Sequence, residues 1–127
     1  MNSRVLIVGA GYVGISYLCL ISDRYKTYVQ EIDKKKVQLL SKFKSPINDK
    51  LITKTLHKNK KNIFLYKDED LNDFDFIILC LPTNYNSVTN YFDLEMLERK
   101  IEFINEQEFK NLVILKSTVP VLSLIHI

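Results

Sequence analysis

The chain has 127 residues, enough for one domain with its own buried core. Hydrophobic residues make up 46% of the sequence and charged residues 26%, a balance that excludes a disordered, fibrous or membrane-spanning protein. The net charge of +3 comes from lysines interleaved with acidic residues, which suits an anionic small-molecule ligand and gives no reason to expect nucleic acid as a partner.

The first predicted elements are a strand at residues 4–8 and a helix at 13–23, joined by a turn with glycines in the spacing G-x-G-x-x-G. Gly9 is expected to make the tight turn, Gly11 to leave room for phosphates, and Gly14 to let the helix pack close to the strand. The backbone N–H groups and the dipole at the helix N-terminus can then hold a pyrophosphate. A strand, glycines and a helix in this order predict a dinucleotide-binding turn rather than a plain connection.

A second strand is expected at residues 27–31, so that Glu31 lies at its carboxyl end, beside the glycine turn. A carboxylate about 20 residues beyond the first glycine can accept hydrogen bonds from the ribose hydroxyls of an adenosine. Its negative charge would repel a 2′-phosphate, so the cofactor is expected to be NAD rather than NADP. Asp33, two residues later, is the alternative ribose ligand.

The rest of the chain alternates between apolar runs and helical segments, as in βαβ units of a parallel sheet covered on both faces. The run at 76–81 is continuously apolar, so we expect an interior strand with both faces buried. The fold class is therefore α/β, a Rossmann-like doubly wound parallel sheet that stops after about its fifth strand. The further strands are expected at 63–66, 75–81 and 112–116, and the further helices at 34–42, 49–58 and 94–105.

An apolar stripe runs along the last helix, for which Asp93 is the expected N-cap. Spacing of this kind indicates a core-facing side rather than a cofactor site. The stripe consists of Leu94, Leu97, Ile101 and Ile104.

Ligands of doubly wound sheets lie at the carboxyl ends of the strands, where the strand order reverses. This rule selects the loops at 9–14, 82–93 and 117–120. Thr83, in the second loop, is the candidate for a hydrogen bond on the nicotinamide side. Ser117 and Thr118, in the third, offer hydroxyls for a ligand or an ordered water.

Cys19 and Cys80 fall inside predicted buried elements. They are too few for a disulfide framework and lack metal-ligand spacing, so we expect two reduced core residues and no metal site. Because no cation lies beside either thiol in the sequence to lower its pKa, neither is expected to be a nucleophile. The basic stretch 57–61 is interpreted as a solvated linker rather than a phosphate-binding patch. With no signal peptide and no long apolar run, a cytoplasmic protein without membrane contact is expected.

Five segments, in their order and spacing, resemble the UDP-glucose 6-dehydrogenases. The glycine turn is shared with the wider nucleotide-sugar dehydrogenases, including those that act on GDP-mannose and UDP-N-acetylmannosamine. The segments NYN and NYFD resemble the bacterial UDP-glucose branch. The segments are GAGYVG at 9–14, SPI at 45–47, PTNYN at 82–86, NYFD at 90–93 and KSTVP at 116–120.

The resemblance implies oxidation of the C6 alcohol of UDP-glucose to the carboxylate of UDP-glucuronate, with two NAD⁺ used in sequence. In the family a cysteine captures the aldehyde, and the thiohemiacetal is oxidised to a thioester that water hydrolyses. By position, Tyr12 and Val13 lie at the pyrophosphate turn, Lys36 near the adenosine and Thr83 in the NAD site. Glu31 stands where the family usually has aspartate, so the carboxylate is displaced by one methylene.

The cysteine nucleophile and most other catalytic side chains of the family lie beyond residue 127. By position, Thr118 matches the family's threonine that positions the catalytic water. The resemblance also implies that Thr118 contributes to the NAD site. Residues 122–127 depart from the family pattern, so we expect an incomplete NAD-binding domain at 1–121 and a non-family tail.

Such a fragment is expected to bind NAD without turning over, while the full-length form acts on UDP-glucose as a homodimer. Two alternatives stay open. One is a non-enzymatic NAD-sensing regulatory domain, and the other is a different NAD-dependent dehydrogenase with the same fold.

Overall fold

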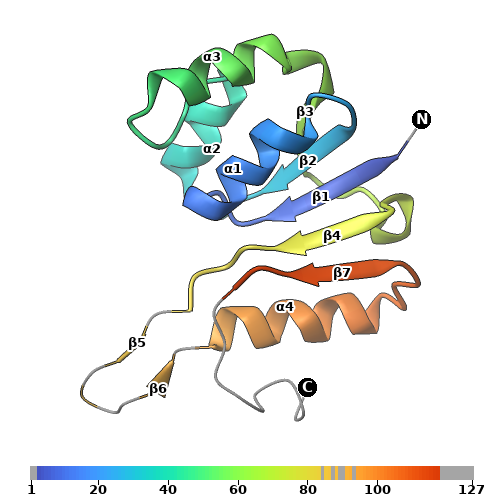
Figure 1. The fold of residues 1–127 in the computed structure, drawn as a ribbon. Helices are drawn as coiled ribbons and strands as arrows, with labels where there is room; N and C mark the ends of the chain where they lie inside the picture. The colour runs from blue at the N-terminus through green and yellow to red at the C-terminus, as the bar shows by residue number, and fades with distance from the viewer. Residues whose placement is uncertain (1–2, 84, 87, 89–90, 93, 118–127) are drawn as a thin grey trace.

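A five-stranded parallel sheet forms the centre of the computed structural model, which describes residues 3–83, 85–86, 88, 91–92 and 94–117 (Figure 1). Its strand order is β3-β2-β1-β4-β7, and every pairing is parallel. This order confirms the Rossmann-like doubly wound sheet. The strands are β1 (Arg4–Val8), β2 (Lys26–Gln30), β3 (Ile63–Leu65), β4 (Phe76–Leu79) and β7 (Leu112–Leu115).

The strand order reverses at β1, because the chain moves outward to β2 and β3 and then crosses back to β4. Residues 66–75, with the 3₁₀ helix η2 (Leu71–Asp73), make this crossing. The ladder between β1 and β4 continues past the strands, since the Cys80 N–H donates to the Val8 carbonyl at 2.8 Å. The carboxyl ends of β1 and β4 therefore meet at the switch point where such sheets bind ligands.

Helices cover both faces of the sheet (Figure 1). The helices α1, α2 and α3 bury residues against one face, and α4 does so against the other. In the described part of the chain, no helix has the length and apolar character needed to cross a membrane. The helices are α1 (Tyr12–Ile21), α2 (Lys34–Ser41), α3 (Lys50–Lys58), α4 (Glu95–Glu106) and the 3₁₀ helix η1 (Lys60–Asn62); β5 (Tyr85–Asn86) and β6 (Tyr91–Phe92) form a separate antiparallel pair.

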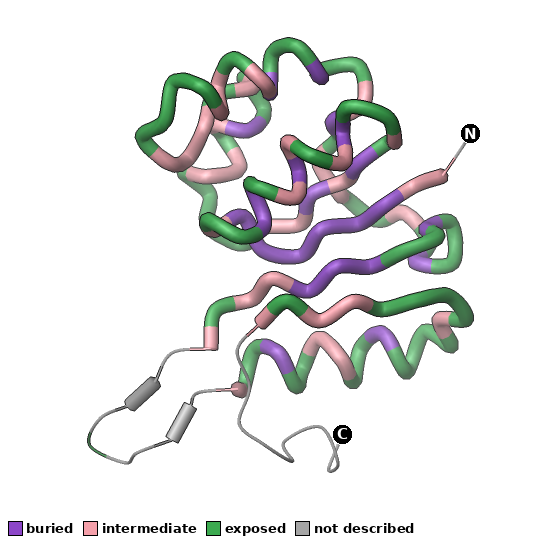
Figure 2. The backbone as a smooth tube through the Cα atoms, viewed as in Figure 1, coloured by how far each residue is buried: buried purple, intermediate pink, exposed green. Residues whose placement is uncertain are grey.

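The strand β1 supplies the centre of both cores, and Figure 2 shows it buried beyond its first residue. Val5 and Ile7 pack on the side of α1, and Leu6 packs on the side of α4. Apolar residues on both faces of a strand are expected where helices cover a parallel sheet on both sides. The apolar stripe of α4 is confirmed as core-facing, with Leu97 and Ile104 buried.

Three details differ from the sequence predictions. The interior strand β4 is shorter than the apolar run, ending at Leu79, and Phe76 at its start is exposed. The N-cap of α4 is Leu94, with no side-chain cap; Asp93, the expected cap, lies outside the described residues. The stretch 57–61 is not a linker, because it ends α3 and begins η1.

A buried side chain anchors that stretch. The Asn59 amide donates to the Ser22 hydroxyl at 3.0 Å and to the Cys19 carbonyl at 3.3 Å. Its neighbouring lysines stay exposed, as expected of solvated charges.

Candidate functional site

The glycine turn after β1 is held in a conformation that favours glycine. Gly9 has φ +102°, in the left-handed region, and a Cβ there would lie 2.5 Å from the carbonyl oxygen of Cys80. Gly14 lies under the turn, where a Cβ would come within 1.8 Å of the Gly9 carbonyl oxygen. The turn, the chain at the end of β4 and helix α1 therefore fit together only with these two glycines.

Gly11 differs from the other two because it borders open space. No atom lies within 4 Å of the position that its Cβ would take. It is the N-cap residue of α1, and no side chain caps that helix. The N–H groups of a helix's first turn have no partner inside the helix, so this end of α1 can receive an anion.

The residues selected from the sequence converge on one cleft of about 520 Å³ at the carboxyl ends of the strands. The loop after β4 and the end of β7 form its other side. Gly14 is buried beneath it, and Thr118 lies outside the described residues. The predicted residues that line the cleft are Gly9, Gly11, Tyr12, Val13, Glu31, Lys36, Thr83 and Ser117.

Glu31 connects the end of β2 to the glycine turn. Its Oε1 accepts a hydrogen bond from the Ala10 N–H at 2.9 Å, and its Oε2 accepts from the N–H groups of Ile32 at 2.7 Å and Asp33 at 3.0 Å. The carboxylate is thereby held at the edge of the cleft, where a ribose hydroxyl would find a charged acceptor.

Asp33, the alternative ribose ligand, caps the N-terminus of α2. Its Oδ1 accepts from the Lys35 N–H at 2.9 Å as the N-cap of α2. Its side chain is not part of the cleft lining. The geometry therefore favours Glu31.

Ser117 and Lys116 bring the end of β7 into the site. The Ser117 hydroxyl donates to the Leu81 carbonyl at 2.8 Å. This hydrogen bond joins the ends of β7 and β4, so the hydroxyl proton is already used within the protein. Lys116 lines the cleft, with its ammonium 5.7 Å from the centre of the Tyr17 ring. Sequence reasoning gave this lysine no separate role, although its place one residue beyond a strand was a usable signal.

The surroundings of both thiols disfavour the thiolate form. Burial raises the pKa of Cys80 from its usual 9.0 to about 11, and the charge of Lys116 offsets part of that rise. Burial and the negative charge of Asp49 raise the pKa of Cys19. Although Cys80 lines the cleft, its raised pKa favours a structural role over a nucleophilic one.

Alkylation of the folded chain is therefore expected to be slow. At pH 8, iodoacetamide should modify Cys80 at least tenfold more slowly than in the urea-unfolded chain, because burial that raises the pKa of Cys80 to about 11 removes most of its thiolate. Peptide mass spectrometry over a time course measures both rates. Rapid native labelling of Cys80 would contradict the structural role.

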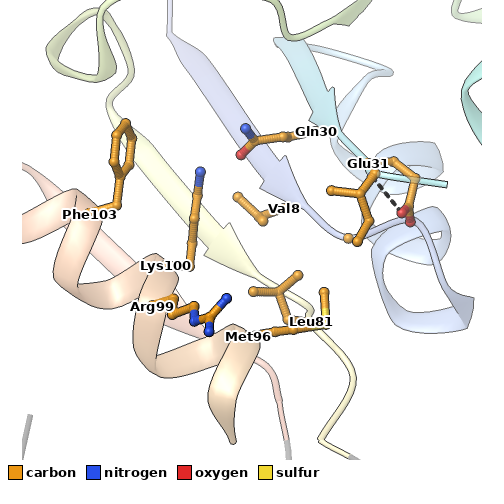
Figure 3. Close-up of a pocket in the computed structure, with 10 residues that line it drawn as sticks. Val8, Gln30, Glu31, Leu81, Met96, Arg99, Lys100 and Phe103 are labelled. Atoms are coloured by element: carbon orange, nitrogen blue, oxygen red, sulfur yellow. Dashed lines mark hydrogen bonds between the residues drawn. The ribbon is translucent and has the colours of Figure 1, made fainter. Parts of the chain in front are cut away.

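A second pocket, of about 270 Å³, opens beyond Glu31 between the end of β2 and α4 (Figure 3). It shares Gly9, Glu31, Leu81 and other lining residues with the main cleft. Its remaining walls come largely from α4, which sequence reasoning treated only as a core helix.

Comparison with known proteins gives the same fold and identifies the family. The model of the UDP-glucose/GDP-mannose dehydrogenase family, NAD binding domain, matches residues 3–127. The chain is 35% identical over 122 residues to the UDP-glucose 6-dehydrogenase of Campylobacter jejuni, covering 93% of this chain and 31% of that protein. It is 32% identical over 119 residues to the UDP-glucose 6-dehydrogenase of Streptococcus pneumoniae, covering 92% and 30%.

Solved structures of dehydrogenases share the fold of this chain. The UDP-glucose dehydrogenase of Pyrobaculum islandicum superposes with a TM-score of 0.81 at 17% identity, covering 94% of this chain and 30% of that one. The GDP-mannose dehydrogenase of Pseudomonas aeruginosa gives 0.78 at 26% identity, covering 91% and 28%. The chain thus spans less than a third of the length of these relatives.

Proposed function

Since the chain belongs to the UDP-glucose/GDP-mannose dehydrogenase family through its NAD-binding domain, we propose that it is the NAD-binding part of a UDP-glucose 6-dehydrogenase. The family makes it part of an oxidoreductase with NAD as cofactor. Two relatives above 30% identity are UDP-glucose 6-dehydrogenases, which supports UDP-glucose as the sugar nucleotide.

The observation that carries the proposal is the single cleft that joins the glycine turn to Glu31 and Thr83. Its residues fit NAD, because Gly11 leaves open space before an uncapped helix N-terminus and Glu31 presents a carboxylate beside it. The first turn of α1 would hold the pyrophosphate and Glu31 the adenosine ribose. Lys36 would lie near the adenosine, and Thr83 would hydrogen-bond on the nicotinamide side. When bound, NAD⁺ supplies the acceptor for a hydride from the substrate.

For the whole protein we propose oxidation of UDP-glucose to UDP-glucuronate with two NAD⁺, carried out by a homodimer. Thr118 would help to position the hydrolytic water. The domain at 1–121 would bind NAD, and residues 1–127 alone would not turn over, because the one thiol among the described residues that line the cleft, Cys80, is a poor nucleophile. The raised pKa of Cys80 supports this last point.

Calorimetric titration of the 127-residue chain with NAD⁺ and NADP⁺ tests the proposal. Saturable binding of NAD⁺, weaker binding of NADP⁺ and no NADH absorbance after addition of UDP-glucose are expected. Absence of NAD⁺ binding would overturn the cofactor site, and steady NADH production would overturn the claim that this part is inactive alone.

A full-length enzyme separates the proposal from its alternatives. Thr83→Ala in that form is expected to lower dehydrogenase activity on UDP-glucose. A purely regulatory NAD-sensing domain would show no such activity before or after the change. A preference for hydroxy acids over sugar nucleotides would instead indicate another NAD-dependent dehydrogenase.

A further inference from the structure

The pocket beyond Glu31 contains a buried acceptor without a partner. Gln30 lies at the end of β2, and its Oε1 is shielded from solvent with no hydrogen-bond partner among the described residues. Nearly all buried polar atoms in folded proteins are hydrogen-bonded, and leaving one unpaired costs free energy. An unpaired oxygen at the wall of a pocket therefore points to a ligand that donates to it.

A cation on α4 faces the same pocket. The half-buried side chain of Lys100 reaches toward the Gln30 amide (Figure 3), and its ammonium lies 4.9 Å from the centre of the Phe103 ring. Burial lowers the pKa of Lys100. A positive charge favours the amide oxygen over the amide nitrogen on the side that faces it. Lys100 would thus favour the orientation of Gln30 in which the amide oxygen is the group presented on that side.

The other walls suit a flat ring. Val8, Leu81, Met96 and Phe103 give the pocket a mostly apolar lining. Arg99, which also lines it, is paired with Glu95 along α4. Apolar walls around a small number of fixed polar groups are typical of sites that bind and orient heterocycles.

The position of the pocket identifies the ring. It adjoins the main cleft at Glu31, where the ribose would be held, and it lies on the α4 side of that residue (Figure 3). A base attached to that ribose would enter the pocket. We propose that Gln30 determines base specificity, its Oε1 accepting a hydrogen bond from the 6-amino group of adenine while Lys100 fixes the orientation of the amide. This inference rests on the proposed binding of NAD.

The test compares NAD⁺ with nicotinamide hypoxanthine dinucleotide, in which an oxygen replaces the 6-amino group. Calorimetry on the 127-residue chain is expected to give about tenfold tighter binding of NAD⁺, because the oxygen cannot donate to Gln30. Gln30→Met should reduce this preference to near unity by weakening NAD⁺ alone. Gln30→Glu, which keeps an acceptor and cannot offer an amide nitrogen, should retain it.

Two further variants complete the design. Lys100→Met should lower the preference, because the amide is then free to turn its nitrogen toward the pocket. Gln38→Met, on the exposed side of α2, is the matched control and should leave the preference unchanged.

Equal binding of the two dinucleotides by the unmodified chain, or an unchanged preference in Gln30→Met, would overturn the role of Gln30 while leaving the NAD site intact. Binding of neither dinucleotide would overturn the proposed function itself. Circular dichroism of each variant shows whether it folds. If Gln30→Met does not fold, Gln30→Leu, which also lacks an acceptor, takes its place, and an unchanged preference in that variant would overturn the role of Gln30 in the same way.

Discussion

Replacement of Gly14 by alanine is expected to lower the free energy of unfolding by about 3 kcal/mol, the upper part of the range for overpacked cores. The added Cβ would lie 1.8 Å from the carbonyl oxygen of Gly9. Neither atom can turn aside, because the oxygen belongs to the backbone and the Cβ position is fixed by it. Helix α1 would have to move away from β1, loosening the buried contacts of Ile15 and Leu18. Urea denaturation followed by circular dichroism measures the loss.

Gly11→Ala is the matched control, because its Cβ would meet nothing within 4 Å. Its stability is expected to change by less than about 1 kcal/mol, as for exchange between weak N-cap residues. Its NAD⁺ affinity should nevertheless fall at least tenfold, since the methyl group would occupy space next to the pyrophosphate. Equal stability losses in the two variants would contradict the close packing assigned to Gly14. Unchanged NAD⁺ binding by Gly11→Ala would contradict the phosphate site.

The structural features that were predictable from the sequence are those that residues adjacent along the chain determine. The apolar run of β1, the glycine spacing and helix α1 follow one another directly, so local pattern is enough to identify the turn. The place of Glu31 follows from the same unit, since β2 pairs with β1 in parallel register. Strand order was likewise constrained, because crossover connections in such sheets follow one hand.

Features that depend on distant parts of the chain were not predictable. The Ser117 hydroxyl donates to a carbonyl 36 positions earlier, and no local pattern indicates that partner. The same holds for Asn59, buried against Ser22 within a stretch that reads as a basic linker. The apolar run of β4 continues to Leu81, yet the strand ends at Leu79, where the chain passes against the Gly9 turn.

The unpaired oxygen of Gln30 belongs to this second group. In the sequence Gln30 is a polar residue at a strand end, where an exposed side chain is common. The burial of its oxygen depends on α4, about 70 residues later, and on how that helix crosses the sheet. Composition and periodicity contain no information about this contact between the end of β2 and α4.

Replacement of Glu31 by alanine is expected to weaken NAD⁺ binding about 30-fold, the loss that corresponds to one or two hydrogen bonds to a charged group. It should also remove most of the preference for NAD⁺ over NADP⁺, because the carboxylate that repels a 2′-phosphate is gone. The N–H groups of Ala10, Ile32 and Asp33 lose their acceptor at the same time, so some loss of stability is expected. Calorimetry with both dinucleotides and urea denaturation separate the two effects.

Glu31→Asp tests whether the extra methylene matters. Two of the three backbone donors lie one and two residues beyond Glu31, whereas the Ala10 N–H, 2.9 Å from Oε1, belongs to the glycine turn. A shorter side chain is expected to keep the near contacts and lose the one to Ala10. The preference for NAD⁺ should then survive while affinity falls only a few-fold.

Asp33→Ala is the control that distinguishes the two acidic residues. Loss of the cap on α2 should cost about 1 kcal/mol of stability, the usual value for an aspartate N-cap. NAD⁺ affinity and the preference over NADP⁺ should stay near those of the unmodified chain. If Asp33→Ala instead matched Glu31→Ala in both binding measurements, the ribose would belong to Asp33. The hydrogen bonds of Glu31 would then serve only to fasten β2 to the glycine turn.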